Sequence, residues 1–174
     1  MKTQKSSVAR AAEPRSFFNV VAVYEDTGAS ARAMEVCQLL ASKLGSEVEL
    51  RSCLWQFDLL RNEPASHCAV AEAVEADLII VAARQNAELR EEVKQWVEAW
   101  VPEKRGQTAA LVALLGQAGT GLVSTTQPHS YLKEAATRAG MDFFLRELPG
   151  AHDHAAGPTG QRPAPQPEDW GLNE

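Results

Sequence analysis

Between Phe17 and Leu148 the chain alternates short apolar or β-branched runs with stretches whose apolar residues recur every three or four positions. Short apolar runs are typical of buried strands, and the longer spacing is typical of helices that bury one face. Strand and helix in regular alternation predict an α/β domain, because parallel strands need crossover connections. We expect a three-layer, doubly wound sandwich around a five-stranded parallel sheet in the order 2-1-3-4-5.

The strand segments differ in how apolar they are. The five are residues 17–24, 48–54, 77–83, 108–115 and 142–148. The first is almost continuously apolar, which predicts that it is the central strand, and the third has the pattern of full burial. The second alternates apolar and polar residues, which predicts an edge strand with one partly wet face.

Helical patterns fill the gaps between these strands. Thr27 or Ser30 is expected to cap the first helix and Gly45 to end it, with Cys37 on the buried face. Three further helices are predicted over residues 64–76, 89–101 and 128–139. Pro102 is expected to help end the third of the four helices, whose two tryptophans should lie in the core.

No fifth helix is predicted after the last strand. The expected organisation is a lead over residues 1–16, one domain over residues 17–148 and a Pro-rich tail over residues 149–174, with both ends disordered. One sheet face would then be covered mainly by the first helix. A tail segment anchored by Trp170, a protein partner or a second copy of the chain would cover the remainder.

Composition excludes several classes of function. The formal net charge of -6, without a basic stripe, argues against binding nucleic acid or an anionic membrane. Three cysteines without a CxxC spacing indicate neither a disulfide framework nor a zinc site, and favour a reducing compartment. No stretch approaches the ~20 apolar residues of a membrane-spanning helix. A cytoplasmic protein is expected.

The order of elements over residues 17–148 resembles the flavodoxin-like fold, and Thr27-Gly28-Ala29-Ser30 resembles the end of the flavodoxin phosphate loop, Thr-Gly-x-Thr. The resemblance implies FMN as a cofactor held by Thr27, Gly28 and Ser30. Arg84, at the end of the third strand, is a further candidate anion ligand because of its guanidinium. The strings around Val20 to Asp26, Ala76 to Arg84 and Val93 to Trp100 are also similar to uncharacterised bacterial proteins of this fold, a resemblance that supplies no activity.

Two departures from flavodoxins argue against FMN. Glu25 and Asp26 stand where flavodoxins have small hydroxylated residues, and these carboxylates would repel a phosphate dianion. The segments 84–88 and 116–127 contain no aromatic residue to stack on a flavin ring. No cofactor is therefore expected, with FMN as the alternative.

Glu25 and Asp26 also resemble the magnesium-binding acids of response-regulator receivers. The phosphoacceptor Asp at the end of the third strand is absent, since Val81-Ala82-Ala83 stands there, so a phosphorelay is not expected. Binding of a divalent cation by Glu25 and Asp26 is a further hypothesis. The pair His152 and His154 has no third ligand nearby in the sequence, and the glycine-rich run after Gly116 lacks the GxGxxG spacing.

The sequence predicts a binding or regulatory module that is not an enzyme. Its expected contact surface is the sheet face without a fifth helix, used for a homodimer or a protein partner. The alternative is a flavin- or nucleotide-dependent oxidoreductase that holds its ligand at the loops after the first, third and fourth strands.

Overall fold

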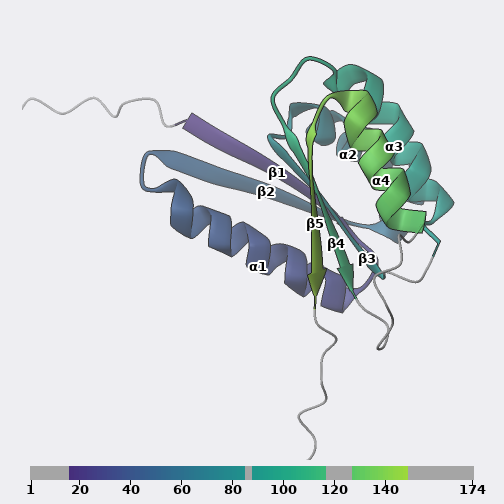
Figure 1. Ribbon diagram of the computed structural model, residues 1–174, viewed down its shortest axis with the longest axis horizontal. Helices are drawn as coiled ribbons and strands as arrows, with labels where there is room; N and C mark the ends of the chain where they lie inside the picture. The colour runs from purple at the N-terminus through teal and green to yellow at the C-terminus, as the bar shows by residue number, and fades with distance from the viewer. Residues whose placement is uncertain (1–15, 85–87, 117–126, 149–174) are drawn as a thin grey trace, which may run out of the picture.

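The computed structural model describes residues 16–84, 88–116 and 127–148 of the chain. Strands and helices alternate along these residues as predicted (Figure 1). In chain order they are β1 Ser16–Tyr24, α1 Thr27–Leu44, β2 Val48–Gln56, a 3-10 helix Phe57–Arg61, α2 Glu63–Glu75, β3 Leu78–Arg84, α3 Glu91–Lys104, β4 Ala110–Gly116, α4 Gln127–Ala139 and β5 Asp142–Leu148.

All five strands pair in parallel in the order β2-β1-β3-β4-β5, which confirms the predicted order. The central strand is β3, so the expectation that the first strand is central was wrong. β1 lies one place in from the edge strand β2. Its second half is apolar because both faces are covered there, and residues 20–23 are 2% exposed or less.

The sheet separates two apolar cores. α1 lies on one of its faces, and α2, α3 and α4 lie on the other (Figure 1). The larger core lies under α2, α3 and α4, and the smaller lies under α1. Alternate residues of each interior strand supply the two cores: Ile79 points to the larger one and Ile80 to the smaller one. Burial of β3 on both faces explains its continuous apolar run.

The start of α1 and the end of α3 differ from the sequence prediction in ways that have a clear physical cause. Asp26, rather than Thr27 or Ser30, caps α1, whose end at Gly45 with φ +76° agrees with the expectation. α3 continues through Pro102 to Lys104 instead of ending at the proline. Proline costs only one backbone hydrogen bond in a last turn, and the buried Lys104 side chain ties that turn to α2.

The tryptophans of α3 lie in the larger core, as predicted. Trp96 and Trp100 are 1% and 0% exposed. Their rings meet edge to face with centroids 5.7 Å apart. Neither indole Nε1 has a hydrogen-bond partner among the described residues.

One part of the sheet is only partly covered. We use "open face" for the α1 side of β4 and β5, which carries Ala110, Val112, Asp142, Phe144 and Arg146. Register pairs Val112 with Phe144, and Phe144 is 56% exposed. Phe143, on the opposite side, packs against the larger core. Among the described residues α1 is the one helix on this side of the sheet (Figure 1). The predicted absence of a fifth helix falls on residues 149–174, which lie outside the described residues.

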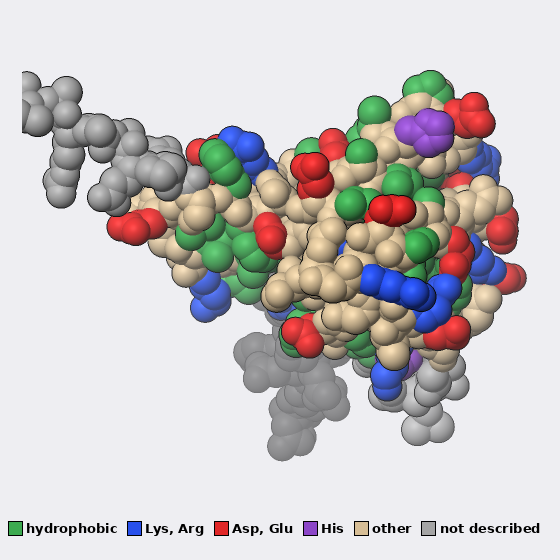
Figure 2. Space-filling view, turned by 90° about the horizontal axis from the view of Figure 1, so that it is seen from above, with side chains coloured by type: hydrophobic (Ala, Val, Ile, Leu, Met, Phe, Trp, Pro, Cys, Tyr) green, Lys and Arg blue, Asp and Glu red, His purple; other side chains and the backbone are tan. Residues whose placement is uncertain are grey.

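Charged side chains of both signs are interspersed over the surface seen from above (Figure 2). None of the described helices is long and apolar enough to cross a membrane.

Candidate functional site

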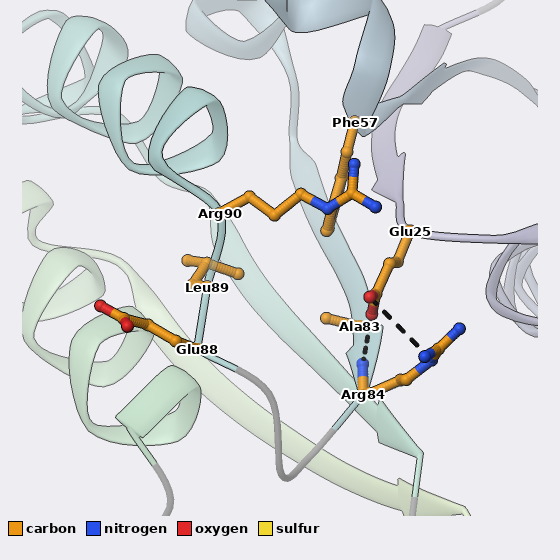
Figure 3. Close-up of a pocket in the computed structure, with 7 residues that line it drawn as sticks. All are labelled: Glu25, Phe57, Ala83, Arg84, Glu88, Leu89 and Arg90. Carbon is orange, nitrogen blue, oxygen red and sulfur yellow. Dashed lines mark hydrogen bonds and ion pairs between the residues drawn. The ribbon is translucent and has the colours of Figure 1, made fainter.

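The loops after β1 and β3 meet at the carboxyl ends of the strands, where parallel α/β sheets bind ligands. The backbone N–H of Glu25 donates to the carbonyl oxygen of Ala82 at 3.0 Å. The Glu25 carboxylate in turn accepts a hydrogen bond of 2.9 Å from the backbone N–H of Arg84 (Figure 3). Glu25 therefore fixes the loop after β1 to the end of β3.

Asp26 occupies the position that the resemblance assigns to phosphate binding. Its carboxylate accepts a hydrogen bond of 2.9 Å from the backbone N–H of Ala29, in the first turn of α1. Its carbonyl oxygen accepts another of 2.9 Å from Ser30. The Ala29 hydrogen bond, helped by Arg84, holds the pKa of the Asp26 carboxyl below its ordinary value. The anion that caps this helix is thus the protein's own carboxylate.

Arg84 is held by the same two acidic residues. Its guanidinium lies 3.2 Å from the Asp26 carboxylate and 3.9 Å from that of Glu25. Arg32 also interacts electrostatically with Asp26, so two guanidiniums face the two carboxylates here. Arg84 is 63% exposed, so these pairs contribute little to stability, but they do reduce its attraction for another anion.

Thr27 and Gly28 lie exposed in the first turn of α1, and Ser30 is partly buried one residue beyond Ala29. The structure therefore brings Thr27, Gly28 and Ser30 to the same helix end, with Arg84 across the loop. A β-carbon on Gly28 would lie 3.4 Å from the Asp26 carboxylate, an ordinary contact. There is thus enough space for a side chain at this position, and glycine is not required on steric grounds.

Arg32 is the residue that sequence reasoning missed. A β-carbon placed on Gly116, at the end of β4, would lie 3.2 Å from its terminal Nη2 atom. One placed on Gly28 would lie 3.6 Å from its Nη1. The Nε of Arg32 is buried and has no hydrogen-bond partner among the described residues. Its spacing of one helical turn from Gly28 was the available signal.

The cavity between these loops is small. About 10 Å³ of open space lies among side chains that include Glu25, Arg84 and Arg90. That is room for about one water molecule. Arg90 extends over Phe57 toward Glu25, whereas Glu88 points away (Figure 3). The described walls of this cavity therefore do not form a flavin-sized pocket.

Metal binding at Glu25 and Asp26 would compete with the contacts these carboxylates already make. No group of three or more His, Cys, Asp or Glu side chains within residues 16–84, 88–116 and 127–148 is arranged to hold a metal ion. His152, His154 and the glycine-rich run 117–126 lie outside the described residues. Residues 85–87 also lie outside the described residues. The prediction that these two loops offer no aromatic ring to a flavin therefore falls mostly on residues that the structure does not describe.

Trp55, near the end of β2, and Phe57, at the start of the 3-10 helix, pack against protein. Phe57 is 1% exposed in the larger core. Trp55 packs against the same core, and its indole N–H donates to the Glu72 carboxylate at 2.7 Å. These contacts account for both rings without a ligand.

A wider groove of about 340 Å³ lies where the first turns of α2 and α3 approach each other. Glu63, Glu91 and Glu92 contribute to its walls. All three stand in the first turn of a helix, where carboxylates interact favourably with the helix dipole. Arg61 also pairs with Glu92 at 3.1 Å. Helix-dipole interactions and the Arg61 ion pair thus explain why acidic residues gather in this groove.

A parallel sheet in the order 2-1-3-4-5, with helices on both faces, defines the flavodoxin-like class of α/β proteins. Among solved structures, the chain is similar to the two-electron reduced flavodoxin of Megasphaera elsdenii, with 18% identity and a TM-score of 0.49. The alignment covers 78% of this chain and 90% of that flavodoxin. No protein-family model matches the sequence. No similar sequence was found among curated proteins.

Proposed function

We propose that this protein is a binding module without enzymatic activity, which does not hold FMN at the N-terminus of α1. The observation that carries the proposal is the hydrogen bond from the Ala29 N–H to the Asp26 carboxylate. A phosphate at this helix end would have to displace that carboxylate or lie beside it. Two unit charges 4 Å apart repel by about 1 kcal/mol in water and about 4 kcal/mol near a protein surface.

FMN titration of the purified chain, followed by quenching of tryptophan fluorescence, tests the first part of this proposal. We expect no saturation below about 100 μM FMN, equivalent to a binding free energy weaker than about -5.5 kcal/mol. The Asp26→Ser variant keeps a helix-capping oxygen and removes the charge, so it should bind FMN more tightly than the natural chain. Saturable binding of FMN at low micromolar concentration by the natural chain would contradict the proposal.

The open face is the proposed contact surface, and its partner is a protein segment that combines apolar with acidic residues. Phe144 offers the apolar contact, 56% exposed. Arg146 is exposed two residues further along the same side of β5, and Arg32 reaches Gly116 at the end of β4. Because basic groups lie beside the exposed aromatic ring, an acidic partner segment fits this surface better than a basic segment does.

Selection of displayed peptides against the full chain would test this surface. We expect enriched peptides that carry an aromatic or aliphatic residue next to Asp or Glu. Their affinity should fall at least tenfold for Phe144→Ser and stay unchanged for the control Phe17→Ser, at a residue 46% exposed on the opposite side of the sheet, packed beside Arg51. Enriched peptides that still bind Phe144→Ser would refute the assignment.

One observation favours the oxidoreductase alternative. The unpartnered Nε of Arg32, between Gly28 and Gly116, is a donor that a phosphate group would satisfy. If FMN, FAD or NADPH binds, Arg32→Gln should weaken binding at least tenfold. Lys43→Gln, at the other end of α1, should leave binding unchanged.

The proposed module acts in a reducing compartment, the cytoplasm. Cys53 and Cys68 are free and exposed, a state that glutathione and thioredoxin maintain in the cytosol.

A further inference from the structure

We propose that residues 168–170 of this chain, Glu168-Asp169-Trp170, dock on the open face and compete there with the partner segment. This inference rests on the proposed function of the open face as a contact surface. It goes further by assigning an occupant from the same chain, and hence a form of regulation.

The open face is apolar at its centre. Phe144 and Val112 are paired neighbours on β5 and β4, and Ala110 lies two residues before Val112 on the same side. Phe144 is 56% exposed, and Ala110 and Val112 are only partly buried although β4 is an interior strand. Leu39 of α1, seven residues after Arg32 and thus on the same side of that helix, is 46% exposed. A large aromatic side chain is suited to cover such a surface.

The end of this face near the last residues of β4 and β5 carries two arginines, whereas the exposed Asp142 lies at its other end. Arg146 pairs in register with Leu114, which places it on the α1 side of the sheet. Arg32 reaches Gly116 from α1 and has a buried Nε without a partner among the described residues. Glu168 and Asp169 immediately precede Trp170, so one short segment offers the complementary charge and the apolar group together.

The connection has a suitable length. The open face lies beside the point where the chain leaves β5 (Figure 1). Twenty-one residues separate Leu148 from Trp170. Fully extended, a segment of this length reaches at most ~70 Å, well beyond the ~23 Å length of a seven-residue strand. Tethering gives the segment an effective concentration on the order of 1 mM, so a weak intrinsic affinity is enough for substantial occupancy.

Photo-crosslinking in the full chain tests this inference. Benzoylphenylalanine replaces Trp170, and the crosslinked peptides are mapped by mass spectrometry. We expect crosslinks within one chain to the segments that form or border the open face, residues 32–43, 110–116 and 142–148. Their yield should fall at least fivefold when Glu168 and Asp169 are changed to Gln and Asn, or when Phe144 is changed to Ser. The control Phe17→Ser should leave the yield within twofold.

Two other results would overturn it. Crosslinks between two chains, seen as a dimer band, would assign the face to a second copy of the chain. Crosslinks scattered over the surface, or absent, would mean that the segment has no preferred site. Peptide selection repeated on Trp170→Ala keeps the two proposals distinguishable. Peptides that bind this variant through Phe144 support the contact surface even if the crosslinks fail.

Discussion

The ammonium group of Lys104 donates a hydrogen bond of 2.8 Å to the carbonyl oxygen of Val74, which joins the last turn of α3 to the last turn of α2. The same group also donates to the carbonyl oxygen of Ala76. Lys104 is 1% exposed, and this burial lowers the pKa of its ammonium group. A buried lysine here satisfies two carbonyl oxygens that the end of α2 leaves without helical partners.

Replacement of this lysine by Met should destabilise the fold, because the apolar stem is kept while two buried carbonyl oxygens lose their donor. We expect Lys104→Met to lower the free energy of unfolding by about 1–3 kcal/mol. Urea unfolding followed by circular dichroism measures the change. Lys133→Met, at an exposed position of α4, is the control and should stay within about 0.5 kcal/mol of the natural chain. Equal stability of the two variants would show that the hydrogen bonds of Lys104 are dispensable.

Glu98 should make a pH-dependent contribution to stability. Its carboxylate accepts hydrogen bonds of 2.6 and 2.8 Å from Arg138 and one of 2.9 Å from the Tyr131 hydroxyl. The Arg138 hydrogen bonds hold the pKa of the Glu98 carboxyl below its ordinary value of 4.5. Because the folded-state pKa is the lower one, this stabilisation is complete above about pH 5 and is lost as the pH falls through the folded-state pKa.

The test compares Glu98→Gln with the natural chain over pH 3–7. The natural chain should be more stable by about 0.2–1 kcal/mol at pH 7, since both side chains are partly exposed, and the difference should shrink toward zero on acidification. The exposed Glu103 on the same helix provides the control variant, Glu103→Gln. A stability difference that is the same at pH 3 and pH 7 would rule out the ionic contribution.

Substitutions at Trp96 and Trp100 should separate ring packing from the indole N–H. Replacement of either by Ala should cost about 3–5 kcal/mol, as expected for emptying a large core site. Replacement by Phe keeps the edge-to-face contact and removes a buried N–H that has no partner among the described residues. We therefore expect Trp96→Phe and Trp100→Phe to cost less than half of the Ala variants in urea unfolding. Equal costs for Phe and Ala would indicate that the N–H is satisfied in solution.

Loss of the Asp26 cap should weaken α1. Asp26→Ala removes the acceptor of the Ala29 N–H and should lower the free energy of unfolding by about 1 kcal/mol. Asp26→Ser keeps a capping oxygen and should recover most of this loss. Thr27→Ala, at the residue that the sequence suggested as the cap, should have little effect. A larger loss for Thr27→Ala than for Asp26→Ala would contradict the observed cap.

Much of the fold could be predicted from the sequence because its signals are local. Continuous apolar residues in β3 and the three-to-four spacing in α3 are visible within single segments. The buried faces follow from these patterns, since each must be hidden from water. The end of α3 was mispredicted because the contact that extends it past Pro102 comes from α2, a separate segment.

The candidate site could be predicted only in part. Glu25, Asp26, Thr27, Gly28, Ser30 and Arg84 do lie together at the carboxyl ends of the strands. The choice of Asp26 as the helix cap depends on its extended backbone, with φ -145° and ψ 177°, which the residue types alone did not determine. Arg32 was missed because its neighbour Gly116 is 84 positions away in the chain.

The sequence by itself determined the alternation of strands and helices, the apolar faces of the helices and the full burial of the third strand. Periodic burial is a property of each segment and needs no knowledge of its neighbours. Only the tertiary structure decided which carboxylate caps α1, that Arg32 reaches the end of β4, that Lys104 closes the end of α2 and that Phe144 remains exposed. These features are contacts, or missing contacts, between segments far apart in the chain. They depend on how strands register and helices pack, which local patterns do not encode.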